Sequence, residues 1–183
     1  MIPRVLLFNH RSNLLGQDNL LAQNVRATIR KHPDWSVVFD TDDTCIEKID
    51  ALLHAPEAVL WYRHASTLGK HKSDLCRLAQ LYVSGGVYVD NDLEVTTPLW
   101  EHVSAKQVTT VTSVDTENIF QALLAAVPGH WLVWKSLQLF LEVIRKERTV
   151  HGWIGPTIMY EAIRSNSSLV HLMRERTRDL PGR

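Results

Sequence analysis

The chain has 183 residues, of which 45% are hydrophobic and 22% are charged, as in an ordinary soluble globular protein. That length is typical of one domain and can bury a core without metal or disulfide staples. Its 20 basic and 20 acidic residues give a formal net charge of zero, so the basic excess of most nucleic-acid-binding proteins is absent. Composition therefore excludes a disordered chain, a collagen-like chain and a disulfide scaffold, and we expect no nucleic-acid partner.

The two cysteines, Cys45 and Cys76, form no C-x-x-C pair, so reduced thiols are the simpler expectation, with a disulfide as the alternative. No run of 18 consecutive apolar residues is present, which predicts no membrane span. The N-terminus enters a short apolar segment without the cleavage site of a signal peptide. We therefore expect a cytoplasmic chain with one domain over 1–183, although a Golgi-lumenal or larger multidomain context stays open.

Short apolar runs alternate with helical patterns along the chain. In the first half, the patterns predict strands at 5–8, 35–39, 59–62 and 87–89, and helices at 18–31, 46–53 and 73–83. In the second half, they predict a strand at 108–114, a loop at 152–156, and helices at 130–145, 157–164 and 169–176. This alternation favours a layered α/β sheet, in which ligands bind beyond the carboxyl ends of the strands. Polar segments at 9–13, 40–43 and 90–92 occupy such places.

The first acidic segment is Asp40-Thr41-Asp42, directly after an apolar strand. An apolar strand that ends in Asp-x-Asp-x-Thr resembles the first motif of haloacid-dehalogenase-type phosphatases. In those enzymes the first aspartate is a nucleophile and the second a general acid. Their later lysine and paired acids are hard to find here, and a strand and a helix already precede Asp40. A turn that caps the next helix is the simpler interpretation, and the phosphatase stays an alternative.

The second acidic segment is Asp90-Asn91-Asp92, after the strand at 87–89. Residues two apart on an extended strand face the same side, so we expect Asp90 and Asp92 to point together and Asn91 to point away. Two converging carboxylates repel each other and favour a divalent cation. Hard oxygen ligands suit Mn²⁺ or Mg²⁺, which share their coordination with phosphate oxygens. In isolation, such a pair is more often only an acidic turn.

The surrounding residues make this second pattern specific. Within 71–92 the sequence places, with little slack, Ser73-Asp74, Arg77, Tyr82, Gly85-Gly86, Tyr88 and Asp90-Asn91-Asp92. The pattern resembles glycosyltransferases with an Asp-x-Asp sugar-binding region, such as outer-chain mannosyltransferases, α-1,4-galactosyltransferases and capsular sugar transferases. Further similar segments are 2–4, 32–35, 117–118, 128–130 and 155–156. Two departures are Trp131, where the family usually has proline, and the lack of a clear counterpart to its late His or Ser-Trp element.

The resemblance implies a GT-A fold, which is a single Rossmann-like αβα domain that binds a nucleotide-sugar. It implies transfer of a sugar from a nucleotide-diphosphate donor, with a UDP-sugar favoured and a GDP-sugar possible. The acceptor would be a glycan or another hydroxyl group, and the anomeric configuration would be retained. The cofactor would be Mn²⁺, with Mg²⁺ possible. A nucleotide-sugar-binding module without transfer activity is the alternative from another class.

The resemblance also assigns roles to individual residues. Asp92 binds the metal directly and Asp90 more weakly, while Asp74 and Arg77 bind hydroxyls of the donor sugar. Asp74 and Arg77 are three residues apart on one helix, so a surface ion pair is the plainer interpretation. Ser73 would cap that helix. The remaining candidates bind the donor (Phe8, Asn9, Lys72 and Asn91) or present the sugar and acceptor for catalysis (Asp115 and Asn118).

Overall fold

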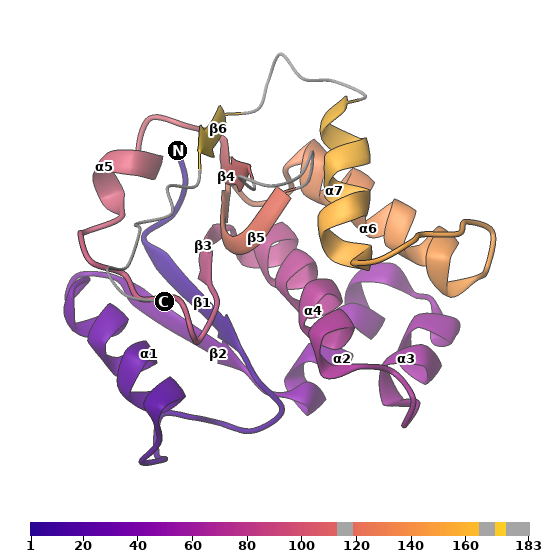
Figure 1. Cartoon of the computed structure of the whole chain (residues 1–183), viewed down its shortest axis with the longest axis horizontal. Coiled ribbons are helices and arrows are strands. Elements are labelled where there is room, and N and C mark those ends of the chain that lie inside the picture. The colour runs from indigo at the N-terminus through magenta and orange to yellow at the C-terminus, as the bar shows by residue number, and fades with distance from the viewer. Residues whose placement is uncertain (113–118, 165–170, 175–183) are drawn as a thin grey trace, which may run out of the picture.

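The computed structural model describes residues 1–112, 119–164 and 171–174. Helices and strands alternate along most of this length (Figure 1). The elements in chain order are β1 (Val5–Asn9), α1 (Leu20–Arg30), β2 (Ser36–Asp40), α2 (Asp42–Leu53), α3 (Pro56–Arg63), α4 (Gly69–Ser84), β3 (Gly86–Val89), α5 (Trp100–Val103), β4 (Val108–Thr112), β5 (Ile119–Ala126), α6 (Trp131–Ile144), α7 (Ile154–Arg164) and β6 (His171–Arg174).

The strands within the described residues form one six-stranded sheet in the order β2-β1-β3-β5-β4-β6. β1 runs parallel to both β2 and β3, and β4 runs parallel to β6. β5 is antiparallel to its neighbours β3 and β4. The carboxyl ends of β1, β2 and β3 therefore lie at one edge of the sheet, where ligands of α/β proteins bind.

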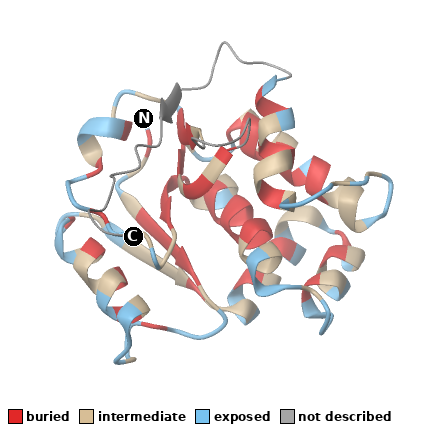
Figure 2. Ribbon diagram, in the orientation of Figure 1, coloured by how far each residue is buried: buried red, intermediate tan, exposed pale blue. Residues whose placement is uncertain are grey.

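The sheet is the middle of three layers, because its strands are apolar on both faces. Leu7 and Tyr88 pack against α2, α3, α4, α6 and α7 on one face. Leu6 and Val87 pack against α1 and α5 on the other face. Successive strand residues point to opposite faces, so this alternation divides the core into two apolar clusters. Figure 2 shows the buried residues on the strands and on the helix faces toward them. The expected αβα layering is confirmed.

Two elements differ in type from the expectation. Residues 59–62 belong to helix α3 rather than to a strand, because Pro56 starts the helix and Ala58 and Tyr62, one turn apart, face the core. A short apolar run does not distinguish a strand from one buried helix face. At the other end, 171–174 pair with β4 as strand β6 instead of forming a helix. β5 and the short α5 were not expected at all.

Three helices begin earlier than their patterns indicate. α2 begins at Asp42 instead of 46, α4 at Gly69 instead of 73, and α7 at Ile154 instead of 157. Ser73 therefore lies inside α4 and does not cap it, and its hydroxyl is free to bond elsewhere. Likewise, residues 154–156 of the loop expected at 152–156 belong to α7. None of the described helices is long and apolar enough to cross a membrane.

The two cysteines form a disulfide, so the expectation of reduced thiols is wrong. Cys45 of α2 and Cys76 of α4 have Cα atoms 5.4 Å apart. They are 1% and 0% exposed, between helices that pack side by side in one apolar cluster. Their separation of 31 positions gave no sign of pairing, because the two residues meet only once α2 and α4 have packed. The bond fixes α2 to α4 at the site-bearing edge.

We predict that this disulfide contributes substantially to stability. Closing a loop with a sequence separation of 31 residues restricts the unfolded chain enough to stabilise the fold by about 3–4 kcal/mol. Urea unfolding of the wild type should therefore shift to a lower midpoint when reductant is present. The double variant Cys45→Ala/Cys76→Ala should unfold at a low midpoint with or without reductant. Equal wild-type midpoints in the two conditions would contradict the prediction.

Candidate functional site

A pocket of about 470 Å³ lies at the carboxyl ends of β1 and β3. Its walls come from the segment after β1, from α1, from the starts of α2 and α4, from α3, and from the turn after β3. The lining residues are Asn9, His10, Arg11, Leu21, Asp42, Tyr62, Thr67, Gly69, Lys70, Lys72, Ser73, Arg77, Tyr88, Asp90, Asn91 and Asp92. Six of the residues expected from the sequence are among them.

The Asp-x-Asp segment is a turn and not a continuation of the strand. β3 ends at Val89, and the N–H of Leu93 closes a turn by donating to the carbonyl oxygen of Asp90, at 3.0 Å. The expectation that Asn91 points away is therefore wrong, because all three motif residues line the pocket. The Asn91 side-chain amide donates to the carbonyl oxygen of Asn9 at 2.8 Å, which ties the turn to β1.

The guanidinium of Arg77 is buried at the floor of this site. It lies 3.3 Å from a carboxylate oxygen of Asp74 and 3.3 Å from one of Asp90. It donates to the backbone oxygen of Gln121 at 2.8 Å and lies over the Tyr88 ring, 4.5 Å from its centroid. Arg77 and Asp74 are 6% and 5% exposed, so they do not form the surface ion pair that their spacing allowed.

Burial and the neighbouring polar groups shift the pKa of Asp90 in opposite directions. Burial raises the pKa of Asp90 above its usual value, because it disfavours the charged form, while the charge of Arg77 opposes the rise. The Tyr88 hydroxyl donates to the same carboxylate at 2.7 Å. Burial also raises the pKa of Tyr88, which keeps the phenol protonated as a donor. One Asp90 oxygen is thus engaged by the protein, whereas Asp92 is exposed to the pocket.

A chain of polar contacts joins β1 to α4. The Ser73 hydroxyl donates to the side-chain oxygen of Asn9 at 2.7 Å, and the Asn9 amide donates to Gln80 at 3.3 Å. Gln80 in turn donates to the backbone oxygen of Phe8 at 2.8 Å. The side chain of Phe8 is fully buried in the core and stacks on Phe39, so Phe8 does not line the pocket, whereas Asn9 does.

Asp74 is near the pocket but does not line it. Its Oδ1 faces Arg77, and its Oδ2 is buried without a hydrogen bond, 3.7 Å from Nδ1 of the His71 imidazole. The start of α7 covers it so closely that a Cβ atom on Gly155 would fall 2.5 Å from Asp74 Cγ. A side chain larger than hydrogen at Gly155 would therefore push α7 off Asp74.

Gln121 is a site residue that the sequence reasoning missed. Its amide donates to the backbone oxygen of Gly155 at 2.9 Å, and its side-chain oxygen is buried without a partner. The one available signal was a single polar residue inside the apolar run 119–126. That run was not recognised as a strand, so the glutamine was not placed at the sheet edge.

The two candidate aspartates of the segment 40–43 lie in different surroundings. Asp40 is buried, forms an ion pair with Lys48 and does not line the pocket. Asp42 does line it, and accepts a hydrogen bond from Tyr62 at 3.1 Å. Lys72 also lines the pocket, with its amino group 5.5 Å from the centre of the Tyr62 ring. Asp115 and Asn118 lie outside the described residues.

We predict that the Arg77 contacts are structural as well as functional. Arg77→Met should lower the free energy of unfolding by about 3–5 kcal/mol, because Asp74 and Asp90 would lose their cation in a buried site. The control is Arg145→Met, which removes an exposed ion pair with Glu57 and should have a far smaller effect. Urea denaturation measures both. If Arg77→Met and Arg145→Met lower the free energy of unfolding by the same small amount, the Arg77 contacts contribute no more than a surface ion pair and the prediction is wrong.

Comparisons with known proteins bear on the fold and on the family of the chain. No curated protein matches the chain. The solved structure of the PaToxG glycosyltransferase is similar, with a TM-score of 0.66 and 17% identity over 90% of this chain and 69% of that one. The UDP-bound glycosyltransferase domain from the YGT toxin has a TM-score of 0.50 and 12% identity, over 83% of this chain and 56% of that one. These likenesses support the GT-A-like fold. Residues 18–111, about half of the chain, match a family model, so the chain belongs to the family described as glycosyltransferase sugar-binding region containing DXD motif.

Proposed function

We propose that this chain is a metal-dependent glycosyltransferase that takes a sugar from a nucleotide-diphosphate donor, with a UDP-sugar favoured over a GDP-sugar. The observation that carries the proposal is the shared pocket, in which the carboxylates of Asp90 and Asp92 lie at the same sheet edge as Lys72 and the buried Arg77. The uridine preference rests on a likeness to the YGT toxin domain, which is described as UDP-bound. The phosphatase alternative loses support because Asp40 pairs with Lys48 away from the pocket.

The carboxylate oxygens of Asp90 and Asp92 are ligands that suit Mn²⁺ or Mg²⁺. Asp92 is exposed to the pocket and is the direct ligand in this proposal, while Asp90 offers the carboxylate oxygen that Tyr88 and Arg77 do not occupy. The described residues contain no group of three or more histidines, cysteines or acids that could hold a metal by themselves. Mg²⁺-type ions are commonly held by one or two carboxylates plus substrate phosphates, so two aspartates suffice when the donor is bound. A bound ion would supply Lewis-acid stabilisation of the leaving diphosphate.

The proposed transfer exchanges one bond at the anomeric carbon. The hydroxyl oxygen of the acceptor forms a bond to that carbon as the bond from the carbon to the diphosphate oxygen breaks. The acceptor's proton passes to the departing diphosphate oxygen on the same face, which retains the configuration. Lys72 stabilises negative charge on the diphosphate side, and Asn9 and Asn91 fix the turn that carries the carboxylates. Arg77 stays with Asp74 on the sugar side. The acceptor is a glycan or another hydroxyl compound.

The donor sugar would lie toward β5, beside Asp74 and Gln121. Each residue has a buried oxygen without a hydrogen-bond partner, and sugar hydroxyls are the donors that would satisfy them. The first turn of α7, at Gly155, covers both residues and must move for a sugar to enter. This covered arrangement is also what favours the second candidate, a nucleotide-sugar-binding module without transfer activity. Hydrolysis of the donor by the isolated chain would discriminate between them.

The first prediction from this proposal concerns the metal. Mn²⁺ together with a nucleotide-sugar at about 100 times its dissociation constant should stabilise the wild type by about 2.7 kcal/mol in a thermal unfolding experiment. Asp92→Asn should lose that stabilisation and the turnover while it keeps the melting temperature of the free protein. Asp34→Asn, an exposed aspartate outside the pocket, is the control. Unchanged nucleotide-sugar affinity in chelator would overturn metal dependence.

The second prediction separates recognition of the sugar from recognition of the nucleotide. Asp74→Asn should weaken binding of the nucleotide-sugar about 10–150-fold, the range for a lost charge-assisted hydrogen bond, and hardly change binding of the free nucleoside diphosphate. Asp50→Asn, on the exposed side of α2, should change neither affinity. Calorimetry with both ligands measures the difference. An equal loss for the two ligands would remove Asp74 from the sugar subsite.

A further inference from the structure

The three residues of the Asp-x-Asp turn are not held in the same way. Asp90 and Asn91 are fixed through their own side chains, by the phenol of Tyr88 and by the backbone oxygen of Asn9. By contrast, no hydrogen bond or ion pair joins the carboxylate of Asp92 to any residue that the structure describes. The direction of this proposed metal ligand therefore depends on the backbone that carries it.

A side chain of helix α1 holds that backbone. The amide nitrogen of Asn24 donates to the carbonyl oxygens of Asn91 and Leu93, both at 2.8 Å. The Asn91 carbonyl belongs to the peptide bond that enters Asp92, and Leu93 directly follows Asp92. Both partners are acceptors, so only the nitrogen end of the amide can face them. Asn24 therefore holds the turn on both sides of Asp92.

Helix α1 is a firm support for this side chain. Val25, the next residue on the helix, is 0% exposed and packs in the apolar cluster on that face of the sheet. The imidazole of His32, two residues beyond the end of α1, accepts the N–H of Leu99 at 3.0 Å. The segment 91–99 is thus attached at both of its ends, by Asn24 at its start and by His32 at its end.

The two faces of the sheet hold different parts of the turn. Arg77 reaches Asp90 from α4 on one face, and Asn24 reaches the backbone around Asp92 from α1 on the other face (Figure 1). Leu21, one helical turn before Asn24, lines the pocket, whereas Asn24 does not. Asn24 is also neutral, so it does not balance the charge of the carboxylates. Its contacts act on the direction of the turn, without touching a ligand.

We propose that Asn24 is a positioning residue, which holds the backbone of the Asp-x-Asp turn so that the carboxylate of Asp92 faces a divalent cation in the pocket. Groups that orient a metal ligand commonly change metal affinity by about 10–100-fold when they are replaced. A turn that is already ordered also loses less conformational entropy when the cation binds. This inference rests on the proposed function, since it concerns the carboxylate that is the direct ligand there.

The test is calorimetry on the full chain, in which Mn²⁺ is titrated in the presence of excess UDP, and of excess GDP in a parallel series. Asn24→Leu keeps the approximate size of the side chain and adds no charge, but it cannot donate to the two carbonyl oxygens. It should lower the affinity for Mn²⁺ by about 10–100-fold. Asn24→Ala should lower it by less, but by more than about two-fold, because water can enter and replace part of the two hydrogen bonds.

The matched control is an asparagine of the same helix with a structural role. Asn19 caps α1, and its side-chain oxygen accepts the N–H of Ala22 at 2.9 Å. Asn19→Ala should lower the midpoint of urea unfolding, because the helix loses its cap, while the affinity for Mn²⁺ stays within about two-fold of the wild type.

The possible failures are distinguishable. Affinities for Mn²⁺ in Asn24→Leu and Asn24→Ala within about two-fold of the wild type would overturn the inference and leave the proposed function intact. An equal loss in Asn19→Ala would also overturn it, because the effect would then follow from the stability of α1. A wild type that binds no Mn²⁺ with either nucleotide would overturn the metal dependence of the proposed function, and this inference with it.

Discussion

The buried guanidinium of Arg77 is the interaction on which the site depends. Asp74 comes from the same helix, Asp90 from the turn after β3, and the Gln121 carbonyl from β5, and all three converge on this cation. Without it, the buried carboxylate of Asp74 and the half-buried carboxylate of Asp90 would be left without their cation in a region that solvates charge poorly. A planar guanidinium can serve several acceptors in fixed directions, which a lysine ammonium cannot. The cation therefore sets where the turn after β3 sits relative to α4 and β5.

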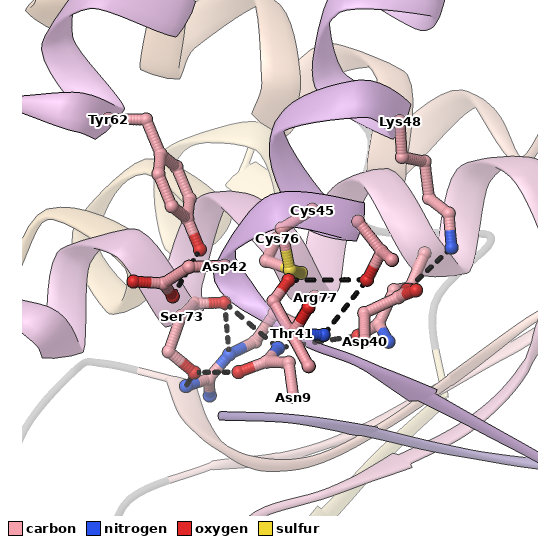
Figure 3. The surroundings of a disulfide bond; sticks show 12 residues. Asn9, Asp40, Thr41, Asp42, Cys45, Lys48, Tyr62, Ser73, Cys76 and Arg77 are labelled. Atoms are coloured by element: carbon pink, nitrogen blue, oxygen red, sulfur yellow. Dashed lines mark hydrogen bonds and ion pairs between the residues drawn. A yellow bond between two sulfur atoms is a disulfide. The ribbon is translucent and has the colours of Figure 1, made fainter. Parts of the chain in front are cut away.

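The opposite wall of the pocket is held by different means. The Cys45–Cys76 disulfide ties α2 to α4, and the Ser73–Asn9 hydrogen bond ties α4 to β1 (Figure 3). Asp42 is one helical turn before Cys45, and Arg77 directly follows Cys76. The covalent link thus acts on the two helices that carry these charged lining residues of the pocket. Rigid support of this kind preserves the spacing on which discrimination between ligands depends.

The sequence was sufficient to predict the elements and the pocket where the hydrophobic pattern and the Asp-x-Asp motif agreed. β1, β2, β3 and α1 follow from apolar runs bounded by polar turns, and the closely spaced motif over 71–92 located the pocket. The prediction from sequence failed where tertiary packing determines whether a segment is a helix or a strand. α3 is too short for its helical period to appear, and β5 is rich in alanine and leucine, which also suit helices. Ser73 was misassigned because the helix start at Gly69 lacks a capping signal.

The rule that ligands meet the carboxyl ends of strands explains both the success and the omission at this site. It correctly directed attention to the ends of β1, β2 and β3, since those strands are parallel. β5 is antiparallel to β3, so its amino-terminal residues reach the same edge, and the N–H of Asp90 donates to the carbonyl oxygen of Ala122 at 2.8 Å. Gln121 is carried into the site in this way, next to Arg77. Because β5 is antiparallel, Gln121 near its start lies at the edge of the sheet where β1 and β3 end. If β5 were parallel to β3, the start of β5 would lie at the opposite edge, away from the site.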